Sequence, residues 1–207
     1  MILPPLYAIT DRALAGGLPH AEIVRCLVDG GVGLIQLREK RLPDRALLAE
    51  ATAAAGVAHA SGALLVLNDR PDIAVLAGAD GAHVGGDDLP AQDARGLLGA
   101  SRLLGVSTHS VDEAVSAGSL PVDYVALGPI FETAHAAVAR PAMGLEAVSR
   151  AAAGLRVPLV AIGGITLERA VEVIAAGAAA VAVMGDLMAA PDMAARASAY
   201  RDRLTLR

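Results

Sequence analysis

The segment LVAIGGITLERAVEVIAAGAAAVAVM, residues 159–184, shows the pattern that decides the fold. It opens with an apolar run, Leu159–Ile162, and closes with a second one, Val181–Met184. Between them lies a helical segment that Thr166 can cap and that stops at Gly177, because Thr is common before the first turn of a helix and Gly just after the last. A strand, a helix and a strand in this order predict two parallel strands joined by a crossover helix.

The same unit recurs along the whole chain. Eight strand-like runs alternate with helical segments: Leu6–Ile9, Leu34–Leu37, Leu64–Leu67, Ala82–Val84, Leu103–Val106, Tyr124–Leu127, Leu159–Ile162 and Val181–Met184. Eight units predict an α/β protein, a (β/α)8 TIM barrel with its functional residues in the loops after the strands. No linker divides the sequence, so we expect residues 1–207 to form a single domain. A doubly wound sheet is the rival, but no Gly-x-Gly-x-x-Gly motif follows the first run.

Composition and charge exclude several classes of protein. Hydrophobic residues make up 55% and charged residues 19% of the chain, which is typical of a globular domain. The formal net charge is −5 and no basic block stands out, so we expect no nucleic acid partner. The single cysteine, Cys26, excludes an internal disulfide and a Cys-based zinc site.

Nothing in the sequence indicates a membrane protein. The first residues lack the basic start and apolar run of a signal peptide. The longest apolar stretch, Val173–Met184, is too short and too interrupted by glycine to span a bilayer. We therefore expect a cytoplasmic protein with no membrane partner, and a homo-oligomer is compatible with the sequence.

An amide and two cations follow the second run. Side chains alternate along a strand, so Gln36, Arg38 and Lys40 share one face, and Leu37 and Glu39 share the other. If the first face is turned to the barrel mouth, it forms a cradle for an anion. The alternative is an ordinary charged loop start whose cations pair with Glu39 or Asp44.

Carboxylates follow the third and fourth runs. Asp69 and Asp88 come after neighbouring strands and can face the same point. Mg²⁺ prefers few carboxylates together with substrate phosphate oxygens, so the pair predicts a magnesium site beside the cationic cradle. Alternatively, Asp69 begins a turn before Pro71, and Asp88 caps the helix at Pro90.

Glycines mark the ends of the last two runs. Gly163 and Gly164 precede a helix, and Met184 and Gly185 follow the eighth run. Backbone N–H groups at such places can hold a phosphate without any charged side chain. Phosphate binding after the seventh and eighth strands is a recurrent feature of barrels, so we expect a second anion site there.

The five histidines fall into three groups. His20 and His59 lie on expected helices, and we expect them at the surface. His83 lies within a strand and is interpreted as a core residue. His109 and His135 belong to loops at the mouth, where they can reach a substrate.

With these residues in place, the chain resembles the thiamine-phosphate synthase and thiazole tautomerase superfamily, and its synthases most closely. The likeness runs in order over nearly the whole length. It rests on Tyr7-Ala8-Ile9-Thr10-Asp11, Gln36-Leu37-Arg38-Glu39-Lys40, Asn68-Asp69-Arg70, Gly81-Ala82-His83-Val84-Gly85 with Asp88, Gly105-Val106-Ser107-Thr108-His109-Ser110, Asp123-Tyr124-Val125-Ala126-Leu127-Gly128-Pro129 and Ala161-Ile162-Gly163-Gly164-Ile165.

The resemblance implies a transferase of thiamine biosynthesis that joins hydroxymethylpyrimidine pyrophosphate to thiazole phosphate, with Mg²⁺ as cofactor. It implies that the pyrimidine pyrophosphate is bound by Gln36, Leu37, Arg38, Glu39, Lys40, Asn68 and Ser107. It implies that the thiazole phosphate is bound by Thr133, Ala134, His135, Gly164, Met184 and Gly185. Arg38, Lys40 and Ser107 are then the catalytic residues, and Asp69 and Asp88 are the ligands of Mg²⁺.

One segment departs from the family pattern. Where the synthases carry Thr-x-Thr-Lys, this chain reads Thr133-Ala134-His135-Ala136, so the lysine is missing. Arg140 is near enough in sequence to replace its charge. Two other functions stay open. A thiazole tautomerase would need His109 or His135 as its proton shuttle, because Pro129 stands where tautomerases have a histidine. A barrel that only binds a thiazole or a pyrimidine is the third reading.

Overall fold

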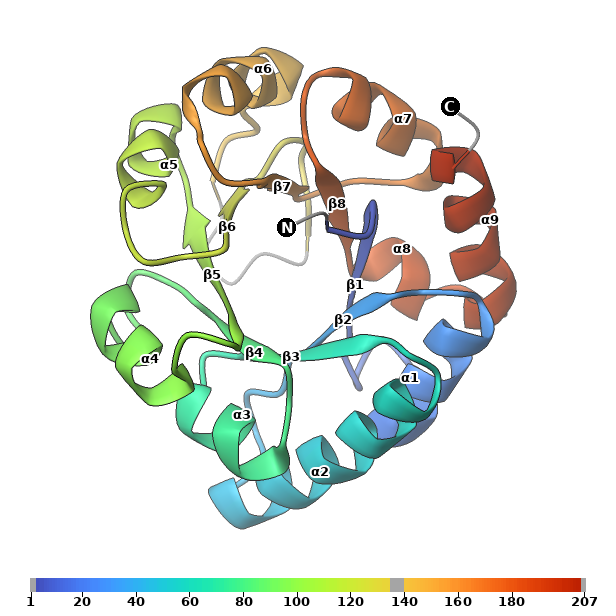
Figure 1. The fold of residues 1–207 in the computed structure, drawn as a ribbon. Helices are drawn as coiled ribbons and strands as arrows, with labels where there is room; N and C mark the ends of the chain where they lie inside the picture. The colour runs from blue at the N-terminus through green and yellow to red at the C-terminus, as the bar shows by residue number, and fades with distance from the viewer. Residues whose placement is uncertain (1–2, 135–139, 206–207) are drawn as a thin grey trace.

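The computed structural model describes residues 3–134 and 140–205, and within them eight parallel strands close into a barrel (Figure 1). The strands are β1 (Leu6–Ile9), β2 (Leu34–Leu37), β3 (Leu64–Asn68), β4 (Gly81–Val84), β5 (Leu103–Thr108), β6 (Tyr124–Leu127), β7 (Leu159–Ile162) and β8 (Ala180–Val183). Each strand pairs with the next along the chain, and β1 pairs with β8, Tyr7 opposite Ala182. The predicted (β/α)8 barrel is therefore confirmed.

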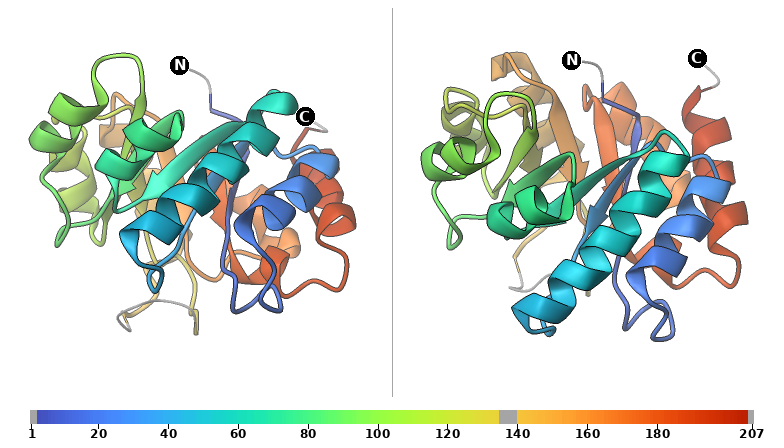
Figure 2. Two further views of the ribbon diagram at one scale, coloured as in Figure 1. Left: turned by 90° about the horizontal axis from the view of Figure 1, so that it is seen from below. Right: turned by 60° about the horizontal axis from the view of Figure 1, so that its bottom comes forward.

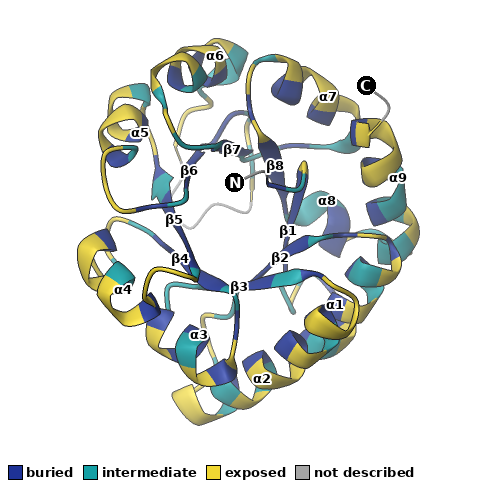
Figure 3. Cartoon of the chain, viewed as in Figure 1, coloured by how far each residue is buried: buried dark blue, intermediate teal, exposed yellow. Residues whose placement is uncertain are grey.

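Helices surround this barrel (Figures 1 and 2). They are α1 (His20–Asp29), α2 (Asp44–Ala60), α3 (Pro71–Ala77), α4 (Ala91–Leu98), α5 (Val111–Ala117), α6 (Gly144–Gly154), α7 (Leu167–Ala175), α8 (Gly185–Met188) and α9 (Met193–Thr205). Their outward faces are exposed and their inward faces are buried against the strands (Figure 3). Among the described residues no helix has the length and apolar character that a membrane crossing requires.

The core has two layers because the strand residues alternate. Ala8 and Ile35 point outward and pack among the helices. Tyr7, Leu34 and Tyr124 point inward and fill the barrel. At the carboxyl ends of the strands this inward layer borders a cavity, which Tyr7 and Ile9 help to line.

The ends of several elements differ from the sequence prediction. β5 continues to Thr108, two residues past the expected end, because its pairing with β6 extends to Leu127. The short helix α8 directly after β8 was not expected. Thr166 is at the start of α7, but its side chain forms no capping hydrogen bond with the helix.

The prediction that His20 lies at the surface is wrong. Its side chain is fully buried at the start of α1, where its Nδ1 lies 2.9 Å from the Thr10 hydroxyl. The backbone N–H of His20 donates to Glu50 of α2, 2.8 Å away. Helical position alone cannot reveal this burial, because it results from the packing of α1 against α2 and the loop after β1.

Candidate active site

A cavity of about 620 Å³ lies at the carboxyl ends of the strands and takes residues from the ends of all eight. It brings together twelve of the predicted site residues: Gln36, Arg38, Lys40, Asn68, Asp69, Asp88, Ser107, Thr133, Ala134, Gly164, Met184 and Gly185. Leu37 and Glu39 do not line it. His135 and Ala136 lie outside the described residues.

We call the part of the cavity after β2, β3 and β4 the cationic half and define it by Arg38, Lys40, Asn68, Asp69 and Asp88. Gln36 and Asp87 line the cavity there as well. Its cations pair across loops and not within their own segment. Arg38 Nη1 donates to Asp11 Oδ2 at 3.0 Å, and Lys40 Nζ lies 2.9 Å from Asp69 Oδ2. The alternative pairing of these cations with Glu39 or Asp44 is therefore not what the structure shows, and Asp44 pairs with Arg70 instead.

Glu39 and Leu37 point away from the cavity, as the strand alternation requires. Leu37 is fully buried in the outer core layer. The Glu39 carboxylate accepts a hydrogen bond from the backbone N–H of Arg41 and lies 3.5 Å from Nε2 of His20. Burial lowers the pKa of His20 and thus favours its neutral form. We infer that these two predicted binding residues shape the loop and do not touch a ligand through their side chains.

Asp69 and Asp88 are positioned by their backbones and by one another. Asp69 has a left-handed φ of 64°, and its N–H donates to the carbonyl of His83 at 2.8 Å. Asp88 Oδ2 accepts from the N–H of Gly85 at 2.7 Å, so it caps that turn and not the following helix. Burial raises the pKa of Asp88, and the neighbouring Asp69 carboxylate raises it further. Such a pair of carboxylates is stabilised by a bound cation.

The donor set fits a divalent ion that takes part of its coordination from a ligand. In the described part of the chain no group of three or more His, Cys, Asp or Glu residues is arranged to hold a metal. Two carboxylates are nevertheless what Mg²⁺ uses when substrate phosphates and water complete its shell.

Asn68 presents a buried hydrogen-bond donor to the cavity. Its Nδ2 atom has no hydrogen-bond partner among residues 3–134 and 140–205, and Asn68 lines the cavity beside Asp69. An unsatisfied buried donor costs about 1–3 kcal/mol. An anionic ligand that accepts this hydrogen bond would remove that cost.

A chain of hydrogen bonds crosses the floor of the cavity. Gln36 Nε2 donates to the Tyr7 hydroxyl (2.9 Å), which contacts the Tyr124 hydroxyl (2.8 Å). The Tyr124 hydroxyl lies 3.1 Å from His83 Nδ1, and His83 Nε2 lies 2.8 Å from Ser107 Oγ. Five residues from five different strands are thus linked, and both ends of the chain, Gln36 and Ser107, face the cavity.

This chain has one direction in which every group is satisfied. With Gln36 as donor, the Tyr7 proton points to Tyr124, whose own proton points to Nδ1 of His83. The Nε2–H of His83 then donates to Ser107, whose hydroxyl proton is left for a ligand. Burial lowers the pKa of His83 to about 4 and raises that of Tyr7 to about 12, so both are neutral at pH 7.

We call the part after β7 and β8 the glycine half; it comprises Gly163, Gly164, Arg169, Met184 and Gly185. Gly163 and Gly164 have φ angles of 99° and 63°, which L side chains rarely adopt. A Cβ on Gly164 would overlap the carbonyl oxygen of Glu132. Glycine is therefore needed for the close approach of the loops after β6 and β7.

The Asp186 carboxylate, next to Gly185, is neutralised by side chains of α9. Asp186 accepts hydrogen bonds from Arg196 (2.8 and 3.0 Å) and from the buried hydroxyl of Tyr200 (2.5 Å), both on α9. Burial alone would raise the pKa of Asp186, but these hydrogen bonds hold it below its ordinary value. The network fixes the end of β8 and leaves little negative charge there to repel an anion.

Sequence reasoning missed four residues that line the cavity or support its floor. Tyr7, His83 and Tyr124 were named only as strand or core residues and as parts of the family motifs, and Arg169 was given no role. A signal existed for His83, because it shares its strand face with Gly85. Arg169 had no such signal, because its helical position does not reveal which loop it reaches. Arg140, suggested from sequence, does line the cavity.

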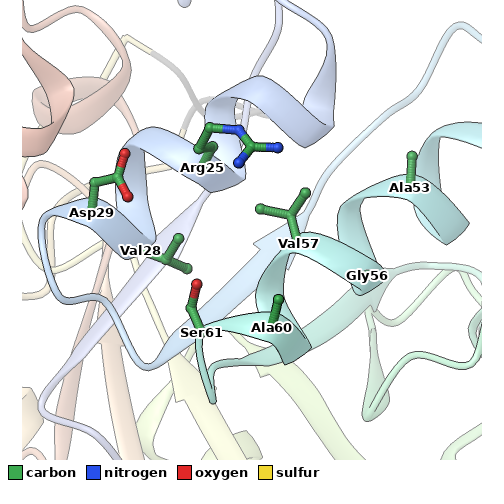
Figure 4. Close-up of a pocket in the computed structure, with 8 residues that line it drawn as sticks. All are labelled: Arg25, Val28, Asp29, Ala53, Gly56, Val57, Ala60 and Ser61. Carbon is green, nitrogen blue, oxygen red and sulfur yellow. The ribbon is translucent and has the colours of Figure 1, made fainter.

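A smaller hollow of about 320 Å³ lies on the outside, between α1 and α2 (Figure 4). Val28, Val57 and Ala60 line it, with Arg25 at its edge. Small and apolar side chains dominate this surface, and it lacks the converging polar groups of the cavity at the strand ends.

A closed (β/α)8 barrel with cations, paired carboxylates and glycine turns at the carboxyl ends of its strands belongs to the barrel enzymes that act on small phosphorylated molecules. Comparison with known proteins narrows this class. Residues 6–187 match the family model described as thiamine monophosphate synthase. The chain belongs to this family.

Named relatives agree along nearly the full length. The thiamine-phosphate synthase of Methanoculleus marisnigri is 44% identical over 199 residues, which cover 96% of this chain and 94% of the relative. The thiamine-phosphate synthase of Moorella thermoacetica is 42% identical over 200 residues, which cover 97% of this chain and 95% of the relative. The structure of a thiamine phosphate pyrophosphorylase from Pyrococcus furiosus superposes with a TM-score of 0.89 at 31% sequence identity. The superposition covers 98% of this chain and 96% of the other. The predicted family and its transferase class are confirmed.

Proposed function

We propose that residues 1–207 act as one thiamine-phosphate synthase domain, which joins hydroxymethylpyrimidine pyrophosphate to thiazole phosphate and releases pyrophosphate. One observation carries this proposal. Arg38 and Lys40 after β2, Asp69 after β3 and Asp88 after β4 converge on a single cavity, and the Lys40–Asp69 pair is 2.9 Å apart. The names of the relatives support the same reaction.

The cationic half suits the pyrophosphate group. Arg38 and Lys40 supply positive charge, and the unpartnered Nδ2 of Asn68 supplies a neutral donor. Mg²⁺, held by Asp69 and Asp88 together with phosphate oxygens, would stabilise the charge that grows on the leaving group. Without any metal, the two carboxylates would repel the same substrate.

The floor of the cavity suits the pyrimidine. Gln36 and Ser107 both face it, and the hydrogen-bond chain leaves the Ser107 proton free to donate to a ring nitrogen. Apolar side chains complete this part and exclude water: Ile9, Ala126, Val160, Ile162 and Ala182. Such a lining protects a reactive cation from hydrolysis.

The reaction needs no general base. The bond from the pyrimidine methylene carbon to oxygen breaks, and both of its electrons leave with pyrophosphate. The lone pair of the thiazole nitrogen then forms the new carbon–nitrogen bond, and no proton is transferred. The protein has to stabilise the leaving group, and Arg38 and Lys40 provide this electrostatic stabilisation.

The glycine half suits the phosphate of the thiazole. Gly164, Met184 and Gly185 line it, and Thr133 and Ala134 line the same cavity. Phosphate binding after the seventh and eighth strands agrees with barrel enzymes in general. The two anions would then lie on opposite parts of one cavity with the pyrimidine between them.

His109 is the feature that favours the tautomerase alternative. It lines the cavity, and its Nδ1 lies 3.0 Å from the carbonyl oxygen of Gly128. A carbonyl oxygen only accepts, so Nδ1 is the donor in this contact, and Nε2 is the nitrogen left to exchange a proton with a substrate. A His109→Gln variant that lost metal-independent conversion of the non-aromatic thiazole tautomer would establish this activity.

The decisive experiment is the coupling assay with the two phosphorylated precursors. We expect thiamine phosphate and pyrophosphate in equal amounts with Mg²⁺, and loss of product when the ion is chelated. Turnover that survives chelation would refute the metal-assisted reaction. If neither product appears while calorimetry shows ligand binding, the protein is a binder.

A further inference from the structure

Two basic residues of the cavity are engaged by acids, and two are not. Arg38 pairs with Asp11 and Lys40 with Asp69. Arg169 and Arg140 also line the cavity, and neither contacts a carboxylate within residues 3–134 and 140–205. Their positive charge is therefore available to a ligand.

Arg169 differs from Arg140 because its guanidinium is held in place. Nη1 donates to the carbonyl oxygen of Gly164 at 2.8 Å, and the guanidinium carbon lies 4.6 Å from the centre of the Phe131 ring. One of the five N–H groups is used, and the remaining four have no partner in the described part of the chain. An arginine fixed by stacking loses less freedom when it binds an anion.

The acidic residues near Arg169 do not form ion pairs with it in the described part of the chain. Asp186 is held by Arg196 and Tyr200, and the Glu168 carboxylate faces Arg196 at 3.7 Å. Glu132 lines the cavity but forms no ion pair with Arg169 in the described structure. The glycine half therefore carries one oriented, uncompensated cation beside the turn at Gly164.

We propose that Arg169 binds the phosphate monoester of the thiazole substrate, with its free N–H groups pointing at the phosphate held beside Gly164. The proposal rests on the proposed function, because it assigns a further residue to the second substrate. A planar fork of N–H groups matches phosphate oxygens in a bidentate geometry that lysine cannot reproduce.

The first test is steady-state kinetics of Arg169→Gln. We expect the KM for thiazole phosphate to rise roughly tenfold to a hundredfold, the range for one charge-assisted hydrogen bond. The KM for the pyrimidine pyrophosphate should stay within about twofold, since that anion occupies the other half. Arg169→Lys should recover only part of the loss. Arg150→Gln, at an exposed position of α6, is the matched control.

A second arm separates this proposal from the proposed function. Calorimetric titration with thiazole phosphate, and with the same thiazole alcohol lacking phosphate, requires no turnover. We expect Arg169→Gln to weaken binding of the phosphate ester about tenfold or more and to leave the alcohol unaffected. Equal losses for both ligands, unchanged affinity for the ester, or a rise confined to the pyrimidine KM would each overturn the role of Arg169. If the wild type binds both thiazoles but makes no thiamine phosphate, the proposed function fails. The titrations of Arg169→Gln still show in that case whether Arg169 binds the phosphate.

Discussion

The two halves of the cavity differ in whether their cations are paired with carboxylates. In the cationic half, each of the two cations already has a carboxylate partner, Asp11 or Asp69, and a third carboxylate, Asp88, lies nearby. The glycine half has backbone turns and one arginine held by a carbonyl and an aromatic ring. Paired charges are oriented but largely neutralised, so an incoming anion there needs an added cation. An unpaired arginine needs none.

The largest effect should come from Asp88→Asn. It removes one of two carboxylates that can hold Mg²⁺, and metal stabilisation of a leaving group is worth several kcal/mol, so kcat should fall by roughly 10²–10⁴-fold. Asn can still accept the hydrogen bond from Gly85. Because burial and Asp69 already disfavour the ionised form of Asp88, the melting temperature should not fall.

The measurement for Asp88→Asn is kcat as a function of Mg²⁺ concentration, together with a thermal melt. Asp93→Asn, an exposed residue of α4, is the control and should behave like the wild type. A fully active Asp88→Asn enzyme would remove the distinction between the two halves.

Lys40→Gln should have the next largest effect. It removes a cation from the cationic half and leaves Asp69 without its partner at 2.9 Å. We expect kcat/KM for the pyrimidine pyrophosphate to fall about tenfold to a hundredfold, as for loss of one charge-assisted hydrogen bond. The KM for thiazole phosphate should not change. Arg41→Gln, an exposed neighbour outside the cavity, provides the control.

Gly164→Ala tests the glycine half through its backbone. The added Cβ would overlap the Glu132 carbonyl, and alanine disfavours the φ of 63°. Overpacking of this kind costs about 1–3 kcal/mol, which corresponds to a melting temperature lower by roughly 2–12 °C for a domain of this size. The KM for thiazole phosphate should rise as well.

The matched variant for Gly164→Ala is Gly56→Ala, in the middle of α2. Apart from the neighbouring backbone of α2 itself, no described atom lies within 4 Å of a Cβ placed there, and its φ is not left-handed. Alanine should therefore stabilise the helix by roughly 0.5–1 kcal/mol. If both variants melted like the wild type, the close approach of the loops after β6 and β7 would be unimportant.

Arg140→Gln should have the smallest effect. The side chain is exposed and, unlike Arg169, is held by no contact in the described residues. Exposed charge interactions are worth about 0.2–1 kcal/mol, so a KM should change by at most about fivefold. The effect should shrink as salt is raised from 0.05 to about 0.5 M. A salt-independent loss would mean that Arg140 acts as a fixed ligand.

Local patterns predicted most of the fold. The eight strands follow from apolar runs of three or four residues separated by helical segments. Their observed ends differ by at most two residues, because pairing partners decide where a strand stops. His20 shows the limit of the method. From sequence alone, a histidine in a helix is predicted to be exposed. The burial of His20 becomes evident only when α1 is packed against α2.

The residues of the candidate site also fall into those that the sequence predicted and those that it did not. Strand alternation was sufficient to place Gln36, Arg38 and Lys40 on one face and to turn Glu39 away. Adjacent strands were sufficient to bring Asp69 and Asp88 together. Nothing local indicates the hydrogen bond between Tyr7 and Tyr124, which are 117 residues apart.

By itself, the sequence determined the barrel, its family and the cationic half, because each depends on periodicity within a strand or on order along the chain. Only the tertiary structure decided that Gln36 connects to Ser107 through the barrel floor, that Asp186 is neutralised from α9, and that Arg169 lies on Phe131 and Gly164. These contacts form when the sheet closes and its loops meet, so their partners are set by three-dimensional packing and not by spacing in the chain.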